Sequence, residues 1–143
     1  MVGKFGPVLV LAAVAMLLPV AACSADATLV GVSYGDFMQA PHASRQVTVP
    51  EGTSVDVSLY SNRTSGFQWE VPYVSDETVL EHVDSRFTGL YDDTVSDPML
   101  PGKDVFAFQT IGEGQTAVEF RYSRPWEGGQ TGVWTFTLVV NVE

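Results

Sequence analysis

The amino-acid sequence predicts an all-β fold, an antiparallel β-sandwich of about seven short strands. Apolar and polar residues alternate in several segments, and this period of two places one face of each segment in a core. Clusters of glycine, proline, asparagine and aspartate separate the segments at short intervals. Beyond the N-terminal region, no stretch shows the apolar period that is typical of a helix.

Four segments carry the strand pattern most clearly. Their alternating apolar residues are Val55, Val57 and Leu59, then Phe106 and Phe108, then Val118, Phe120 and Tyr122, and finally Trp134, Phe136, Leu138 and Val140. Another strand contains Phe67 and Trp69. Because residues two apart on a strand share a face, we expect at least Trp69 to lie in the core.

The N-terminal region has the layout of a secretory signal. Lys4 gives a short basic start, an apolar run covers residues 8–20, and small residues precede Cys23. The segment resembles a bacterial lipobox, in which the cysteine becomes the acylated first residue of the mature protein. An ordinary cleaved signal with an incidental cysteine is the alternative. We therefore predict a signal peptide over residues 1–22, and a lipid on Cys23 that anchors the exported protein to the membrane of the bacterial cell envelope.

The remainder of the chain has the length of one domain. We expect residues 23–45 to form a lipidated N-terminus and a tether that can end in an edge strand, and residues 46–143 to form the sandwich. Cys23 is the only cysteine, so no intramolecular disulfide can form and the core must supply the stability. The formal net charge of −10 disfavours nucleic acid as a partner.

Several motifs of common enzymes are missing from the sequence. It contains no His-Glu-x-x-His, no Cys-x-x-Cys and no phosphate-binding glycine-rich loop. We expect His42 and His82 to be ordinary surface residues, and the spacing of nearby aspartates in residues 92–97 is not that of an EF-hand. The sequence therefore predicts no catalytic residue, no metal or other cofactor and no small-molecule substrate.

Two turn-forming segments stand out between the predicted strands. In residues 62–67, the Asn62 loop, we expect Asn62 to brace the turn and Gly66 to adopt a backbone angle that other residues resist. In residues 124–132, the Trp126 loop, Pro125 fixes its own backbone and presents the indole of Trp126 rigidly. The alternatives are a turn with no function in the first loop, and in the second an indole folded onto the sandwich edge with Arg124 paired to a carboxylate such as Glu127.

These two segments resemble the chagasin family of cysteine-protease inhibitors. Family members carry Asn-Pro-Thr-Thr-Gly-(aromatic)-x-Trp after one strand and Arg-Pro-Trp after a later one. This chain has Asn62-Arg63-Thr64-Ser65-Gly66-Phe67-Gln68-Trp69 and Arg124-Pro125-Trp126 in the same order. Arg63 stands where the family usually has proline, and Ser65 replaces the second threonine. The family's third loop has a Gly-x-Gly-Gly core, of which only Gly102 matches here.

The resemblance implies an immunoglobulin-like sandwich of about seven to eight strands that inhibits papain-like cysteine proteases. Three adjacent loops would enter the active-site cleft without being cleaved, with Thr64 and its neighbours over the catalytic centre and Trp126 on the primed side. The implied protease-binding residues are Asn62, Arg63, Thr64, Ser65, Gly66, Phe67, Leu100, Pro101, Gly102, Lys103, Arg124, Pro125 and Trp126. The alternative is an envelope-anchored interaction module that keeps the sandwich but has lost protease binding.

Overall fold

The computed structural model describes residue 3, residues 27–94 and residues 97–143. The predicted signal peptide and Cys23 lie outside the described residues, so the lipid anchor stays a prediction. Within the described ranges, no helix has the length and apolar character needed to cross a membrane.

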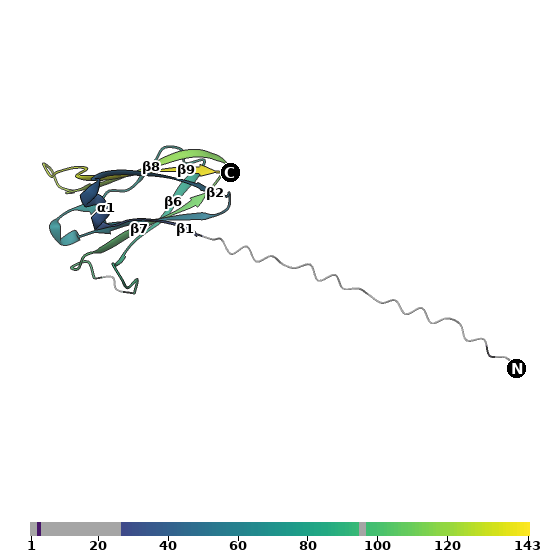
Figure 1. Cartoon of the computed structure of the whole chain (residues 1–143), viewed down its shortest axis with the longest axis horizontal. Helices are drawn as coiled ribbons and strands as arrows, with labels where there is room; N and C mark the ends of the chain where they lie inside the picture. Colours follow the sequence, from purple (N-terminus) through teal and green to yellow (C-terminus); the bar gives the residue numbers. More distant parts are fainter. Residues whose placement is uncertain (1–2, 4–26, 95–96) are drawn as a thin grey trace.

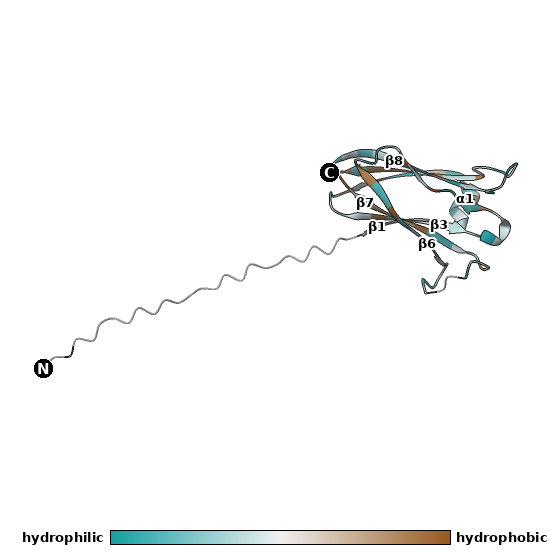
Figure 2. Cartoon of the chain, turned by 180° about the vertical axis from the view of Figure 1, so that it is seen from behind, coloured by the Kyte–Doolittle hydropathy of each residue, from teal (hydrophilic) through white to brown (hydrophobic). Residues whose placement is uncertain are grey.

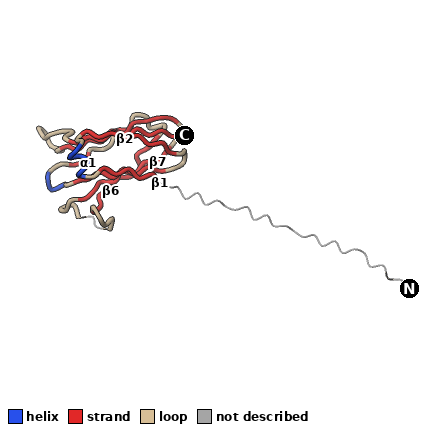
Figure 3. The backbone as a smooth tube through the Cα atoms, in the orientation of Figure 1, coloured by secondary structure: helices blue, strands red, loops and turns tan. Residues whose placement is uncertain are grey.

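Two β-sheets pack face to face (Figures 1 and 3). The first sheet has the strand order β1-β3-β7-β6, with bounds Ala27–Val32, Ser54–Ser61, Gly102–Thr110 and Leu80–Gly89. The second has the order β2-β9-β8-β4, with bounds His42–Val49, Trp134–Val142, Gly114–Ser123 and Gln68–Trp69, and β5 (Tyr73–Val74) pairs with β8. Two short helical elements, α1 (Tyr34–Gln39) and the 3₁₀ turn η1 (Arg63–Ser65), complete the described part of the chain.

The predicted all-β sandwich is confirmed, with nine strands in the described residues. The four strongly alternating segments form β3, β7, β8 and β9, and Figure 2 shows hydrophobic residues along the strands of both sheets. Trp69 is buried and its indole N–H donates to the carbonyl of Tyr60 at 2.9 Å. Not every pairing is antiparallel, however, because β1 runs parallel to β3 and β2 runs parallel to β9. Parallel neighbours need long connections, and here other elements separate both pairs along the chain.

The expected tether is part of the sandwich from Ala27 onward. Strand β1 occupies one edge of the first sheet, β2 occupies one edge of the second, and α1 passes between them. Val30, Val32 and Phe37 bury this segment in the common core, where Phe37 is 0% exposed. The hydroxyl of Ser33 and the carboxylate of Asp36 form a capping box that starts α1. The expected edge strand is therefore present twice, together with a helix too short to show a period in the sequence.

Strand register places the loops of interest at one end of the sandwich. Ser61 at the end of β3 and Gly89 at the end of β6 both pair with Gly102 at the start of β7. Tyr122 near the end of β8 likewise pairs with Trp134 at the start of β9. We call this end the loop pole. It carries the Asn62 loop, the Trp126 loop and the Leu100 loop, which we define as residues 90–94 and 97–101, and α1 lies beside them (Figure 1).

Candidate functional site

The Asn62 loop is a tightly bonded turn. The amide of Ser65 donates to the carbonyl of Asn62 (3.2 Å), and the amide of Gly66 donates to the carbonyl of Arg63 (3.1 Å). The Ser65 hydroxyl also donates to the Asn62 carbonyl, and the Thr64 hydroxyl donates to the Asn62 side-chain oxygen, each at 2.6 Å. Asn62 therefore braces the turn as predicted, and Gly66 has the expected left-handed backbone with φ +84°.

A buried phenol fastens this turn to the second sheet. The amide of Asn62 donates to the hydroxyl of Tyr122 (2.9 Å), which in turn donates to the Asn62 carbonyl (3.2 Å). Tyr122 is only 3% exposed. Hydrogen bonds of this kind are worth more where water is excluded, so they hold the start of the turn in one position.

The Trp126 loop lies directly against the Asn62 loop. A Cβ added to Gly66 would be 2.7 Å from Cη2 of the Trp126 indole, a separation that real side chains do not reach. Two features therefore require glycine at position 66: its left-handed backbone angle, and the space next to it that the indole fills. Trp126 nevertheless keeps 55% of its surface exposed. The two predicted loops form one continuous surface, and the indole is not buried between the sheets.

Arg124 orients this indole through aromatic contacts rather than through an ion pair. Its guanidinium lies 4.6 Å from the ring centroid of Phe67 and 5.8 Å from that of Trp126. The ion pairs of the described residues do not include Arg124, so the alternative in which it pairs with Glu127 is wrong. A cation between two ring faces is attracted by both, which links the two loops.

A row of stacked rings forms the floor beneath these loops. Phe37 of α1 stacks on Trp134 at 4.9 Å between centroids, Trp134 stacks on Tyr122 at 5.1 Å, and Tyr122 stacks on Phe67 at 5.5 Å. Offset stacking adds to the stability that burial gives. The row runs from α1 across both strands β9 and β8 to the Asn62 loop, so the turn rests on the core.

The Leu100 loop contributes a different kind of surface. Leu100 and Met99 are 52% and 72% exposed, and their amides bond only to the neighbouring Asp97. Pro101 is exposed as well, whereas Gly102 is buried at the start of β7, where an added Cβ would meet Phe87. Gly102 is therefore a packing residue and not a surface for contact. Exposed apolar side chains take the place of the glycine-rich core that the resemblance implied.

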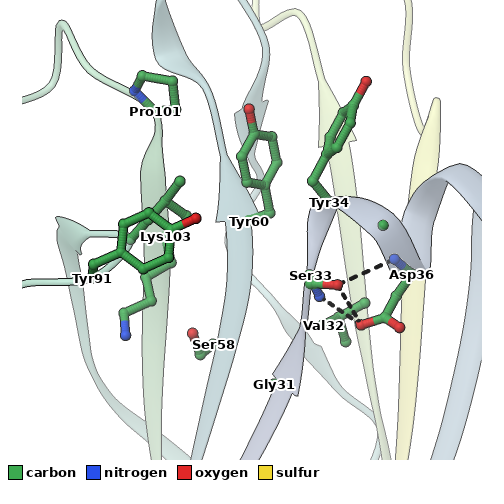
Figure 4. A pocket seen from close by; sticks show the side chains of 12 residues that line it. Gly31, Val32, Ser33, Tyr34, Asp36, Ser58, Tyr60, Tyr91, Pro101 and Lys103 are labelled. Carbon is green, nitrogen blue, oxygen red and sulfur yellow. Dashed lines mark hydrogen bonds between the residues drawn. The ribbon is translucent and has the colours of Figure 1, made fainter.

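Lys103 lines an open groove next to this loop. The groove has a volume of about 770 Å³ and lies between the β1–α1 segment and the Leu100 loop, with Tyr34, Tyr60 and Tyr91 among its lining residues (Figure 4). Burial, followed by the neighbouring Tyr122 and Tyr34, raises the pKa of Tyr60, which favours its neutral form. The ammonium of Lys103 lies 3.1 Å from the carboxylate of Asp93. The sequence analysis missed this groove because one of its walls comes from the segment expected to be a tether.

Arg63 is oriented toward the sandwich and not toward the tip of its loop. Its Nη2 donates to Oδ1 of Asp104 at 2.7 Å, and its guanidinium lies 4.8 Å from the ring centroid of Phe87. Asp104 is a site residue that the sequence analysis did not find. Its signal was present, because it occupies a core-facing position of β7 in alternation with Phe106 and Phe108.

No group of three or more His, Cys, Asp or Glu side chains in the described ranges is arranged to hold a metal ion. The site therefore consists of backbone turns, aromatic rings and a few charges. Such a surface is suited to recognition of another protein, because rigid aromatic side chains serve as anchors in protein interfaces.

The chain was compared with known families and structures. The model of the chagasin family of peptidase inhibitors, family I42, matches residues 48–140. The cysteine protease inhibitor EhICP2 from Entamoeba histolytica has a similar structure, with 16% identity, coverage of 82% of this chain and 96% of that chain, and a TM-score of 0.60. PbICP-C, solved in complex with falcipain-2, is similar at 11% identity, with 71% and 89% coverage and a TM-score of 0.51. No curated protein matches the sequence. At these identities the structural similarities show a shared fold.

Proposed function

The chain belongs to the chagasin family of peptidase inhibitors, and from this we propose that it inhibits papain-like cysteine proteases by placing its loop pole in their active-site cleft. Membership of a family of inhibitors agrees with the prediction from the sequence that the protein is not an enzyme. The observation that carries the proposal for this chain is the contact between Gly66 and the half-exposed indole of Trp126, which joins two loops into one wedge.

Rigidity is the physical basis of the proposed inhibition. Binding costs free energy for every loop and side chain that becomes ordered, and a surface that is ordered beforehand avoids much of this cost. The Asn62 loop is held by its own hydrogen bonds and by Tyr122, and the Trp126 indole is held by Gly66 and Arg124. Such a wedge blocks the cleft while its turn presents no extended peptide carbonyl to the catalytic thiolate.

Each loop has a separate part in this proposal. Thr64 and Ser65, at the tip of the central turn, cover the catalytic cysteine and histidine of the protease. Trp126 packs on the primed side of the cleft, and Leu100 with Pro101 packs on the other side. Arg63 directs its guanidinium toward Asp104 and so supports the turn from within the inhibitor, although its side chain stays 41% exposed, and Gly102 is buried and packs inside the sandwich.

Titration of papain with the purified protein tests the proposal. Activity on a fluorogenic peptide should fall in proportion to added protein until one equivalent is present, and mass spectrometry after long incubation should find the inhibitor intact. Unchanged activity across several papain-like enzymes would reject the proposal and favour an interaction module without protease binding.

We also propose that a lipid on Cys23 anchors the protein to the membrane of the bacterial cell envelope. Support comes from the direction of β1, since Ala27 pairs with Ser54 at the end of the sandwich opposite the loop pole (Figure 1). An anchor attached four residues before Ala27 then leaves the loop pole free to meet a protease. Metabolic labelling with an alkyne fatty acid tests this: the parent protein should be labelled and sediment with membranes, and Cys23→Ser should do neither.

A further inference from the structure

We propose that Asp104 is a positioning residue, which acts through Arg63 to hold the Asn62 loop in its inhibitory conformation. The inference rests on the proposed function and adds to it a residue that lies outside the three loops. It starts from one juxtaposition: a nearly buried carboxylate of β7 lies within hydrogen-bond distance of the first residue of the η1 turn.

The geometry of this contact is that of a short charged hydrogen bond. Arg63 Nη2 and Asp104 Oδ1 are 2.7 Å apart, and the side chains are 41% and 9% exposed. Charged hydrogen bonds at this distance are stronger than neutral ones. The guanidinium also lies over the ring of Phe87 on β6, at 4.8 Å from its centroid. We call these contacts the Arg63–Asp104 brace.

The burial of Asp104 determines the direction in which the side chain of Arg63 points. Arg63 is its one hydrogen-bonding partner among the side chains of the described residues. A buried carboxylate that loses its partner is costly, because water cannot replace the lost interaction. Arg63 is therefore held toward β7, and the backbone of the η1 turn, which begins at Arg63, is held with it.

The brace also connects two parts of the proposed interface. Asp104 follows Gly102 at the start of β7, and Phe87 lies near the end of β6, so the two strands that carry the Leu100 loop are the strands that Arg63 contacts. The Trp126 loop reaches the Asn62 loop from the other side through Gly66. The Asn62 loop thus receives support from both sheets, and the brace is the side-chain ion pair that joins it to the first sheet.

A proline at position 63 removes the Arg63–Asp104 brace but keeps the backbone shape of the turn. Arg63 occupies the first position of η1, where proline is well tolerated, and Asn62 before it is extended, with φ −128° and ψ 92°. Arg63→Pro therefore keeps the backbone of the turn but leaves the carboxylate of Asp104 buried without its partner. Arg63→Pro with Asp104→Asn removes that charge as well.

The experiment compares the parent with Asp104→Ala, Arg63→Pro and the double variant, and uses Arg86→Ala as the matched control. Arg86 forms a looser pair with Asp56 at 4.0 Å on two strands of the same sheet, and neither residue belongs to the candidate site. Three quantities are measured for each: the inhibition constant for papain, the thermal midpoint, and hydrogen exchange at the amides of Ser65 and Gly66, with the amides of β9 as an internal reference.

We expect Asp104→Ala and Arg63→Pro each to raise the inhibition constant about tenfold, as expected when binding must reorder a loosened loop. Exchange at Ser65 and Gly66 should accelerate while exchange in β9 does not. Because Arg63→Pro alone already removes the brace, adding Asp104→Asn should not weaken inhibition further, and Arg86→Ala should leave all three quantities near those of the parent.

The proposal is overturned if Asp104→Ala and Arg63→Pro inhibit like the parent, or if exchange accelerates equally in β9 and in the loop, which would indicate general destabilisation. If Asp104→Ala does not fold, the comparison of the double variant with Arg63→Pro decides the question, and a further loss of inhibition in the double variant overturns the proposal, because Asp104 would then act other than through Arg63. If the parent itself fails to inhibit papain, the proposed function falls, while the exchange measurements still decide whether the brace orders the loop.

Discussion

The Asn62 loop and the Leu100 loop lie at the same pole but are held in different ways. The Asn62 loop is bonded to Tyr122 of one sheet and, through Arg63, to Asp104 of the other. The hydrogen bonds of Met99 and Leu100 reach no further than Asp97. Binding energy in interfaces concentrates in well-packed residues at the centre. The Asn62 loop with its Trp126 neighbour should therefore supply most of the affinity, and the Leu100 loop should supply an adaptable flank.

Gly66→Ala should have the largest effect. The new methyl group would lie 2.7 Å from the Trp126 indole at a residue with φ +84°, so both loops must move. We expect a loss of about 3 kcal/mol of binding free energy, roughly 100-fold in the inhibition constant. Gly52→Ala is the matched control, because it has φ +85° with nothing within 4 Å. Inhibition by Gly66→Ala as tight as that by Gly52→Ala would contradict this prediction, because the contact between Gly66 and the indole would then contribute nothing to binding.

Trp126→Ala should have the second-largest effect on inhibition. The indole is 55% exposed and rigidly presented, as in an interface anchor. We expect a loss of about 2 kcal/mol or more of binding free energy for a papain-like enzyme, with the free energy of unfolding nearly unchanged. Inhibition kinetics and denaturant unfolding measure the two quantities. A variant that titrates the enzyme like the parent would remove Trp126 from the interface.

Tyr122→Phe should have a smaller effect, on both stability and inhibition. The substitution deletes the hydroxyl that accepts from the Asn62 amide and donates to its carbonyl, and it keeps the stacked ring. Loss of such bonds at a buried site costs about 1 kcal/mol. Thermal unfolding and inhibition should both register it. If stability falls while inhibition stays the same, Tyr122 supports the core but does not hold the loop.

Leu100→Ala should have the smallest effect. Because Leu100 is 52% exposed and its amide bonds only to Asp97 of the same loop, we expect a loss of about 0.5 kcal/mol or less of binding free energy. The same papain titration measures it. A loss greater than that of Trp126→Ala would invert the comparison and place the main anchor on the flank.

Strands with one buried face could be predicted from the sequence, and strands without that pattern could not. Strands β3, β7, β8 and β9 were predicted because their alternating residues enter the core. Strand β6 was missed, since it is an edge strand that buries little besides Leu80 and Thr88 and shifts register between His82 and Asp84. For residues 23–45 the sequence predicts only a tether that can end in an edge strand, because few apolar residues stand among small and polar ones.

The same limit applied to the site. Local turn chemistry identified the Asn62 and Trp126 loops, because Asn62, Gly66 and Pro125 act on their own backbone. Arg63 and Asp104 are 41 residues apart in the sequence, and only strand order makes them neighbours. Long-range pairs of this kind set the direction of a side chain, so the sequence does not show that the guanidinium of Arg63 turns toward Asp104.

Strands β1 and β2 have a consequence for how the domain can be shortened. Each is an outer strand that covers its inner neighbour, β3 in one sheet and β9 in the other, and pairs backbone amides and carbonyls that would otherwise form an open edge. A chain that started at residue 46 would lose all of β1 and half of β2, and it would expose two open edges at once. Open edges recruit further strands, so such a fragment should self-associate and precipitate even though every loop residue is still present.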